Sequence, residues 1–218
     1  MTAAAKAAVV TSVAFAALTI AVSLNALTIL DTHAILAARA LHEPWMLPLM
    51  RGVSLVAHGD LAIPIALLIS AGLYRLGQQQ DAACYAAACL SGWGANLLLK
   101  EIVRHPRPVG ISPKLTDAGW YSYPSGHAML AVLVYGLGAY FLTRRAPAGV
   151  RTAALAASAL LAALVAFSRV YLGAHWPSDT VGALLAGTAW ASGAVALLDR
   201  RAHPVGSRAG YSPESEGP

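Results

Sequence analysis

The chain has 218 residues, of which 57% are hydrophobic and only 11% are charged, and its formal net charge is +5. Its apolar residues come in long uncharged blocks instead of the spaced stripe of a soluble amphipathic helix, which excludes an ordinary soluble globular domain. The basic residues lie at the ends of these blocks and form no run, so the positive charge does not indicate a nucleic-acid partner.

The uncharged blocks predict an all-α, polytopic membrane protein with a bundle of six transmembrane helices. About 20 helical residues cross the hydrocarbon core of a bilayer. The first block is long enough to do so, and we expect it to stay in place as a signal-anchor because no cleavage site follows it. The second block is short, so its helix must extend past Arg75 or back through His58. The expected spans are residues 7–30, 61–74, 82–99, 128–143, 153–167 (continuing to about 172) and 180–198.

Residues 1–200 are expected to form a single domain that contains all six spans. Within it, residues 31–60 mix apolar and charged side chains and are interrupted by Pro44 and Pro48. This mixture is typical of short helices that lie on the membrane surface. Residues 201–218 are polar and contain Pro and Gly, so we expect a disordered tail.

The basic residues predict the orientation of the spans. Arg144, Arg145 and Arg151 crowd one short loop, and Arg200 and Arg201 follow the end of the last span. The positive-inside rule places this side, with both chain termini, in the cytoplasm. The basic residues of the opposite side then face the periplasm or the exterior, where an anionic ligand would account for them.

Three short stretches each bring several polar residues together beside an apolar block. They are residues 100–108 (KEIVRHPRP) after the third span, residues 123–127 (YPSGH) at the start of the fourth, and residues 168–179 (SRVYLGAHWPSD) between the fifth and sixth. An even number of membrane crossings separates them. All three stretches are therefore expected on the same side of the membrane.

The polar residues of these stretches suit a tetrahedral oxyanion such as phosphate. Lys100, Arg107 and Arg169 supply positive charge, Ser125 can donate a hydroxyl hydrogen bond, and Gly126 lets a backbone N–H approach a ligand closely. Ser125 and Gly126 also lie at a helix start, where free N–H groups and the helix dipole favour an anion. Such a set would stabilise the charge on a phosphoryl group during its transfer.

Two histidines and an aspartate supply the reactive groups. Neutral imidazole can act as a nucleophile or carry a proton near neutral pH. Asp179, in the opening turn of a helix that starts at Pro177, can accept the second ring N–H of His175. We therefore expect His175 to be the nucleophile and Asp179 to orient it. His127 would be the general acid for the leaving oxygen and later the base that activates water.

Each of these residues also has a structural interpretation. Lys100 and Arg169 could be interfacial anchors at helix ends, Ser125 only an N-cap, and Gly126 only a turn residue. These interpretations do not account for cations, donors, two histidines and a carboxylate on one side of the membrane. For three neighbouring residues we expect no more than a place on the outer rim of the site: Arg104, His105 and Lys114.

The chain resembles the type 2 phosphatidic acid phosphatase (PAP2) superfamily of membrane lipid phosphatases. That family's signature has three parts, Lys-x6-Arg-Pro, Pro-Ser-Gly-His and Ser-Arg-x5-His-x3-Asp. The resemblance implies the helical fold of the PAP2/acid phosphatase–haloperoxidase type, a phosphohistidine intermediate, and no metal or other cofactor. The residues that match the signature are Lys100, Arg107, Pro108, Pro124, Ser125, Gly126, His127, Ser168, Arg169, His175 and Asp179. The resemblance implies that six of them surround the phosphate: Lys100, Arg107, Ser125, Gly126, His127 and Arg169.

The resemblance further implies a phosphatase of the bacterial cytoplasmic membrane, surrounded by membrane lipids. Its substrate would be a lipid phosphate such as undecaprenyl diphosphate, phosphatidylglycerophosphate or phosphatidic acid. Three alternatives remain: a phosphotransferase to a lipid or sugar acceptor, a vanadate-dependent haloperoxidase, and a lipid-binding or transport protein without turnover. The last is disfavoured, because binding alone would need the cations but not His127, His175 and Asp179. The sequence does not indicate an oligomeric state.

Overall fold

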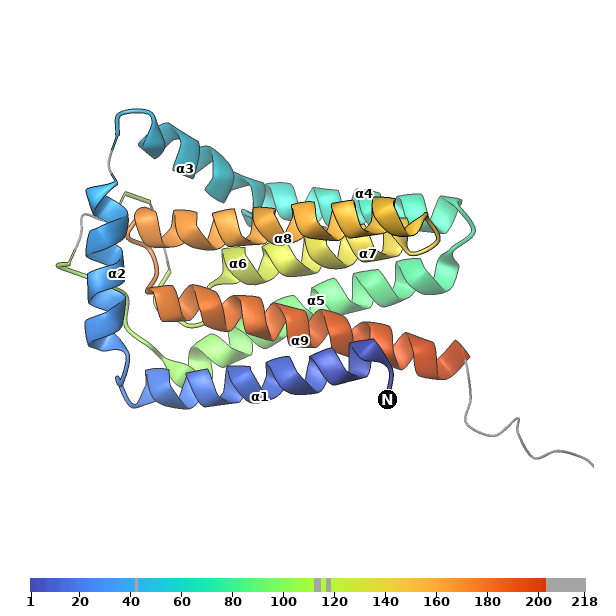
Figure 1. Ribbon diagram of the computed structural model, residues 1–218, viewed down its shortest axis with the longest axis horizontal. Coiled ribbons are helices and arrows are strands. Elements are labelled where there is room, and N and C mark those ends of the chain that lie inside the picture. The colour runs from blue at the N-terminus through green and yellow to red at the C-terminus, as the bar shows by residue number, and fades with distance from the viewer. Residues whose placement is uncertain (42, 112–114, 117–118, 203–218) are drawn as a thin grey trace, which may run out of the picture.

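The structure is a computed structural model that describes residues 1–41, 43–111, 115–116 and 119–202 (Figure 1). Within these ranges all regular secondary structure is helical, which confirms the predicted all-α fold. The elements are α1 (Ala3–Ser23), α2 (Thr28–Ala40), α3 (Met46–Val56), α4 (Gly59–Arg75), α5 (Gln79–Val103), α6 (Gly126–Leu130), the π-helical η1 (Ala131–Gly136), α7 (Leu137–Thr143), α8 (Ala148–Tyr171) and α9 (Pro177–Ala202).

The described helices supply five or six membrane crossings, in agreement with the prediction of six. Five segments are long and apolar enough to cross a bilayer: Ala3–Ser23, Gln79–Val103, Gly126–Thr143, Ala148–Tyr171 and Pro177–Arg200. Helices α3 and α4 pass the same test only as a pair, and they meet at 44°. Where the pair forms one span, the second span, which is too short in the sequence, gains its length from a bent extension on its N-terminal side. His58 caps the start of α4 by accepting the Asp60 N–H through Nδ1 at 3.4 Å.

The predicted first span, residues 7–30, was wrong at its C-terminal end. Helix α1 stops at Ser23, and after a turn a separate helix, α2, starts at Thr28 and lies across the end of the bundle (Figure 1). Asn25 adopts a left-handed backbone conformation with φ 56° in this turn, which asparagine tolerates better than most residues. Because the turn is itself uncharged and mostly apolar, hydropathy alone does not separate the two helices.

Helix α9 lies alongside α1 over much of its length and also packs against α5, α6 and α8 (Figure 1). Small residues at four-residue spacing on α9 allow close approach. Ala183 is fully buried, and a Cβ on Gly187 would lie 3.0 Å from the Cβ of Val132. Small residues at this spacing are typical of close helix–helix packing in membrane proteins.

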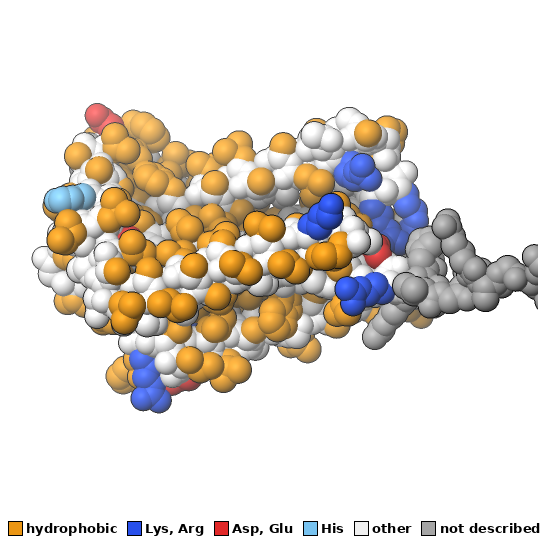
Figure 2. Space-filling model, turned by 60° about the horizontal axis from the view of Figure 1, so that its bottom comes forward, with side chains coloured by type: hydrophobic (Ala, Val, Ile, Leu, Met, Phe, Trp, Pro, Cys, Tyr) orange, Lys and Arg blue, Asp and Glu red, His pale blue; other side chains and the backbone are white. Residues whose placement is uncertain are grey.

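The outside of the bundle is apolar along its length and carries basic side chains near its ends. Figure 2 shows hydrophobic side chains over the lateral surface and Lys and Arg side chains gathered where α9 ends. Val10, Leu68, Leu90 and Leu160 are among the large apolar side chains that face outward. Such a surface is stable where lipid replaces water, and the chain is accordingly a multi-pass membrane protein.

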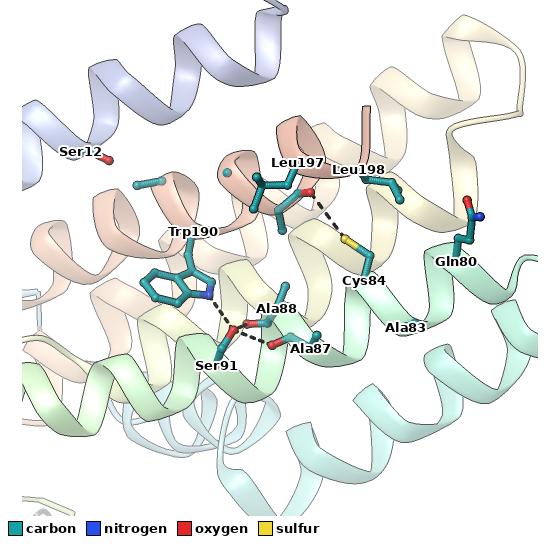
Figure 3. Close-up of a pocket in the computed structure, with 13 residues that line it drawn as sticks. Ser12, Gln80, Ala83, Cys84, Ala87, Ala88, Ser91, Trp190, Leu197 and Leu198 are labelled. Atoms are coloured by element: carbon teal, nitrogen blue, oxygen red, sulfur yellow. Dashed lines mark hydrogen bonds between the residues drawn. The ribbon is translucent and has the colours of Figure 1, made fainter. Parts of the chain in front are cut away.

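A lateral groove of about 830 Å³ lies between α1, α5 and α9 (Figure 3). Its wall is mostly apolar, and several of its polar groups bond to each other or to the backbone. Trp190 Nε1–H donates to Ser91 Oγ at 3.0 Å, and the Cys84 thiol donates to the Ala194 carbonyl at 3.6 Å. The groove contains none of the predicted site residues, so it is not the reactive site.

Candidate active site

The three sequence stretches meet at the end of the bundle where α8 ends and α9 begins (Figure 1). The first stretch covers the end of α5 and the segment after it, the second leads into α6, and the third is the short connection from α8 to α9. The structure brings together all the residues predicted for the site, which are Lys100, Arg107, Ser125, Gly126, His127, Arg169, His175 and Asp179.

His175 and Asp179 form a buried pair at the start of α9. Nδ1 of His175 lies 3.3 Å from Oδ2 of Asp179, and the same carboxylate oxygen accepts the Trp176 N–H at 2.9 Å. Since Pro177 is the first residue of α9, Asp179 lies in its first turn, as predicted. A carboxylate at this position also faces the positive end of the helix dipole. The local sequence therefore fixes the Asp179 side chain before any ligand is present.

The neighbours of His175 define which of its ring nitrogens carries the proton. An ionised carboxylate only accepts hydrogen bonds, so Nδ1 must be the donor toward Asp179. On the other side of the ring, Nη1 of Arg107 lies 3.4 Å from Nε2, and a guanidinium only donates. Both contacts require the tautomer with the hydrogen on Nδ1, in which the Nε2 lone pair points toward Arg107. Attack on phosphorus would therefore require this 3.4 Å contact to open.

Burial keeps His175 neutral. Desolvation lowers the pKa of His175 to about 4, although the hydrogen bond and the charge of Asp179 act in the opposite direction. The positive charges of Arg107 and Lys100 lower this pKa further. At neutral pH the ring is therefore the uncharged imidazole that nucleophilic attack requires.

Lys100 holds the segment that leads into α6. Its Nζ lies 2.8 Å from the Pro124 carbonyl and 3.2 Å from each of the Tyr121 and Ser122 carbonyls. An ammonium group has three hydrogens, so these three carbonyls occupy all of them. Lys100 therefore brings positive charge to the site, but binding a phosphate oxygen directly would require it to release one carbonyl.

Arg107 is held in a similar way. Its Nε donates to the Gly119 carbonyl at 2.6 Å, Nη2 donates to the Tyr121 carbonyl at 2.9 Å, and Nη1 donates to the Ala174 carbonyl. Burial lowers the pKa of this guanidinium, while the negative charge of Asp179 raises it. The result is a cation fixed beside Nε2 of His175, where a phosphoryl oxygen would arrive.

Ser125 and Gly126 lie at the start of the span Gly126–Thr143. The Ser125 N–H donates to the backbone carbonyl of Asp179 at 3.1 Å, which joins the second stretch to the third. A Cβ on Gly126 would lie 3.2 Å from the Trp93 ring and 3.4 Å from Asn96 Oδ1, so glycine permits this close packing on α5. The Ser125 Oγ is buried and has no hydrogen-bond partner among the described residues.

Arg169 lies in the last turn of α8 and is almost completely buried. Its Nη1 donates to Ser54 Oγ at 2.6 Å, and its backbone carbonyl accepts the N–H groups of Ala174 and His175. Within the described part of the chain, its Nε has no hydrogen-bond partner. Buried donors without partners are costly, and an anion that reached Arg169 Nε or Ser125 Oγ would supply the missing acceptor.

His127 follows Gly126 and is half-buried. The side chains of Arg169, His175 and Lys100 are close enough to interact with it electrostatically. The ring centroid of His58 lies 5.6 Å from that of His127. His58 has no role in the sequence prediction, and it reaches this place because it caps α4 at the bend after α3.

His105 does not belong to the outer rim, where the sequence analysis placed it. Its side chain is only 10% exposed, and Nδ1 lies 3.0 Å from Oδ1 of Asp179. Arg104 is exposed, as expected, and donates through Nε to the Glu101 carbonyl. Lys114 lies outside the described residues.

Three supporting polar residues were missed by the sequence analysis. Ser54 meets Arg169, and Asn96 donates to the Pro124 carbonyl at 3.4 Å. Asp31, on α2, accepts the N–H of Ser178 at 2.9 Å and its hydroxyl at 2.5 Å, which holds the first turn of α9. The position of Asn96, four residues before Lys100 on one helix, was a signal that could have been used. No comparable signal marks Ser54 or Asp31, whose partners are remote in the sequence.

Comparison with known proteins gives a consistent result. The family model described as the PAP2 superfamily matches residues 81–202, more than half of the chain. Phosphatidylglycerophosphatase B of Bacillus subtilis is 29% identical over 170 residues, covering 77% of this chain and 83% of the relative. An undecaprenyl-diphosphatase of Sulfolobus acidocaldarius is 40% identical over 82 residues, covering 38% of this chain and 34% of that protein.

Two solved structures have similar folds. The crystal structure of a transmembrane PAP2-type phosphatidylglycerolphosphate phosphatase from Bacillus subtilis matches with a TM-score of 0.82 and 27% identity, covering 88% of this chain and 96% of that one. Aquifex aeolicus LpxE matches with a TM-score of 0.60 and 18% identity, covering 75% of this chain and 93% of that one. At that identity, the second match supports the fold alone.

Proposed function

Because this chain belongs to the PAP2 superfamily and is a membrane phosphatase by that relationship, we propose that it hydrolyses a lipid phosphate through a phosphohistidine formed on His175. One observation carries the proposal. The neutral Nε2 of His175, oriented by Asp179, faces the cation of Arg107, and unpartnered donors of Ser125 and Arg169 lie in the same site.

The proposed hydrolysis has two steps. In the first, Nε2 of His175 attacks phosphorus, the P–N bond forms and the bond from phosphorus to the leaving oxygen breaks. His127, protonated once the anionic substrate is bound, gives that oxygen its proton. The imidazole ring becomes positively charged, and Asp179 stabilises it through Nδ1–H. In the second step His127 takes a proton from water, the hydroxide oxygen attacks phosphorus, and the P–N bond breaks to restore neutral His175.

The cations serve the transition state in both steps. Negative charge spreads over the three oxygens of the phosphoryl group that do not leave, and fixed donors stabilise it without reorganising. Arg107 and Arg169 are held by backbone or side-chain partners before the substrate binds, so they meet this requirement.

We propose phosphatidylglycerophosphate as the first substrate to test. The relative named for this activity, phosphatidylglycerophosphatase B, aligns with 77% of the chain. Undecaprenyl diphosphate comes second, because that similarity covers a shorter part. The site would face the periplasm or the exterior, with the end of the bundle at which α9 ends in the cytoplasm (Figure 2).

The test is a phosphate-release assay with the full chain in detergent and EDTA, using these two lipids, phosphatidic acid and a lipid A phosphate. We expect release from at least one lipid, an acid-labile phosphoenzyme, and loss of both in His175→Ala. His33→Ala is the matched control, since His33 is exposed on α2. Activity that EDTA abolishes and a divalent metal restores would overturn the proposal, as would a fully active His175→Ala variant. Transfer of the phosphoryl group to an added acceptor instead of water would identify a phosphotransferase.

A further inference from the structure

His105 contacts the carboxylate that orients the nucleophile. Its Nδ1 lies 3.0 Å from Oδ1 of Asp179, while Nδ1 of His175 lies 3.3 Å from Oδ2. Asp179 has no exposed surface, and the His105 side chain is 10% exposed. One buried carboxylate therefore lies between two imidazole rings, one on each oxygen.

The direction of the hydrogen bond at His105 follows from its neighbours. The hydroxyl of Ser122 lies 3.2 Å from the same Nδ1, but it can donate to the backbone carbonyls of His105 at 3.0 Å or Pro106 at 2.9 Å. The carboxylate of Asp179 can only accept, so Nδ1–H of His105 points to it. Ser122 thus supports the ring without competing for the carboxylate.

Holding both oxygens fixes the rotation of the Asp179 side chain. Oδ2 accepts from Trp176 N–H and from His175, and Oδ1 accepts from His105. Without His105, Oδ1 would lose its imidazole donor in a buried site, where an unsatisfied charged group is costly. The carboxylate would then turn toward any other donor, and His175 would lose the partner that sets its tautomer and its direction.

A contact with the ring of Trp176 also supports a fixed position for His105. Its ring centroid lies 6.1 Å from that of Trp176, whose Nε1–H donates to the Pro106 carbonyl at 2.8 Å. The segment after α5 is therefore joined to the α8–α9 connection by His105 and by the backbone beside it. The family signature leaves position 105 unspecified within Lys-x6-Arg-Pro, so the signature does not account for this contact.

We propose that His105 is a positioning residue for the phosphatase reaction, because its Nδ1–H holds Oδ1 of Asp179 while Oδ2 orients His175. The inference rests on the proposed function of His175 as the nucleophile. It assigns no contact between His105 and the substrate.

The first experiment compares three variants of the full chain in detergent with the wild type. His105→Leu removes the donor, and His105→Asn keeps an N–H close to the place of Nδ1. His33→Leu is the control for a histidine change at an exposed position. We expect His105→Leu to lower kcat by about 10- to 100-fold, as loss of an orienting partner often does, with KM changed less than about threefold. His105→Asn should recover most of the loss.

A double-mutant cycle separates positioning from a general structural effect. If His105 acts through Asp179, His105→Leu should lower the residual kcat of Asp179→Asn only slightly, because the carboxylate is already absent. Equal fold-losses in both backgrounds would overturn the proposal. So would a wild-type kcat in a folded His105→Leu protein, or a loss that His105→Asn does not recover.

A spectroscopic measurement does not depend on activity. In protein labelled with [15N]histidine, the Nδ1–H proton signals of His105 and His175 are assigned with His105→Leu and His175→Gln. Asp179→Asn should shift both signals, whereas a shift of the His175 signal alone would overturn the shared carboxylate. If the wild type released no phosphate from any lipid, the proposed function would fail, and these spectra would still decide whether His105 holds Asp179.

Discussion

The ammonium of Lys100, near the end of α5, lies 2.8 Å from the carbonyl oxygen of Pro124, directly before the serine that opens α6. Two further carbonyls of the same segment bind the same nitrogen. The first sequence motif therefore supports the second through the backbone. The lysine fixes the path of the segment that places Ser125 and His127, besides contributing positive charge.

This double role predicts that Lys100→Met lowers stability as well as activity. Three carbonyls lose a charged donor, and we expect the free energy of unfolding to fall by about 1–3 kcal/mol. The melting temperature in detergent should fall by several degrees, at roughly 2–4 °C per kcal/mol. We expect kcat to fall by about 100-fold or more, because a fixed cation is lost from the transition state.

Lys100→Arg is the informative companion. A planar guanidinium cannot direct three hydrogens to three carbonyls around one point, so we expect it to remain defective despite its charge. An unchanged melting temperature in Lys100→Met would contradict the supporting role and leave Lys100 as a phosphate ligand only.

A glycine on α9 is predicted to be essential for the packing of the second stretch. Tyr123 is fully buried, its hydroxyl lies 2.8 Å from Thr19 Oγ1, and its ring stacks on Phe15 with centroids 6.0 Å apart. A Cβ on Gly182 would lie 2.5 Å from the Tyr123 hydroxyl oxygen. Gly182→Ala should therefore displace the ring and cost about 1–3 kcal/mol, with a fall in kcat because Ser125 follows closely.

The matched control is Gly193→Ala, on the same helix. A Cβ at that position meets no heavy atom within 4 Å. Alanine is the better helix former, so we expect this variant to be as stable as the wild type or up to about 1 kcal/mol more stable. Thermal unfolding of both variants in the same detergent gives the comparison. Equal melting temperatures would show that the Tyr123 contact carries no stability.

The sequence was sufficient for the helical bundle and for the shared side of the three stretches, because both follow from uncharged length and the number of crossings. The end of α1 could not be predicted in this way, because the turn at Asn25 carries no charge and does not interrupt the apolar block. His105 was misplaced because its partner, Asp179, lies 74 residues away in the sequence, and no periodicity relates them. The same holds for Ser54 and Arg169, which are 115 residues apart.

The environment of His175 predicts a pH dependence of stability. Its pKa is lowered from about 6.5 to about 4, so between these pH values the unfolded chain binds a proton that the folded chain does not. The contribution of this group to stability is therefore constant above pH 6.5 and is lost as the pH falls toward 4. His175→Gln lacks this titration and should lose less stability over the same range.

The measurement is the melting temperature of both proteins between pH 7 and pH 4.5. Apart from the groups that interact with His175, the titrating groups are common to the two proteins, so the difference between the curves reports on His175 and its direct partners. We expect the difference to change in favour of His175→Gln by several degrees as the pH falls, on the scale of 2–4 °C per kcal/mol. A difference that stays constant with pH would contradict the lowered pKa.

The other end of the bundle provides a prediction that separates stability from chemistry. Asp81, in the first turn of α5, has a buried carboxylate, with Nη2 of Arg144 3.0 Å from Oδ1 and Nη1 of Arg145 3.4 Å from Oδ2. The side chain of Arg144 is 25% exposed and that of Arg145 is 57% exposed. Water screens the ion pair with the less exposed Arg144 less strongly. The loss of that pair is therefore expected to cost more stability than the loss of the pair with Arg145.

Arg144→Ala should therefore lower the free energy of unfolding by about 1–3 kcal/mol, whereas Arg145→Ala should change it by less than about 1 kcal/mol. Neither variant should alter kcat at a temperature where it is folded, because both arginines lie at the end of the bundle remote from His175. Thermal unfolding and phosphate release on the same preparations test both statements. Equal destabilisation by the two variants would show that exposure does not rank these partners, and a selective fall in kcat would show that the two ends of the bundle are coupled.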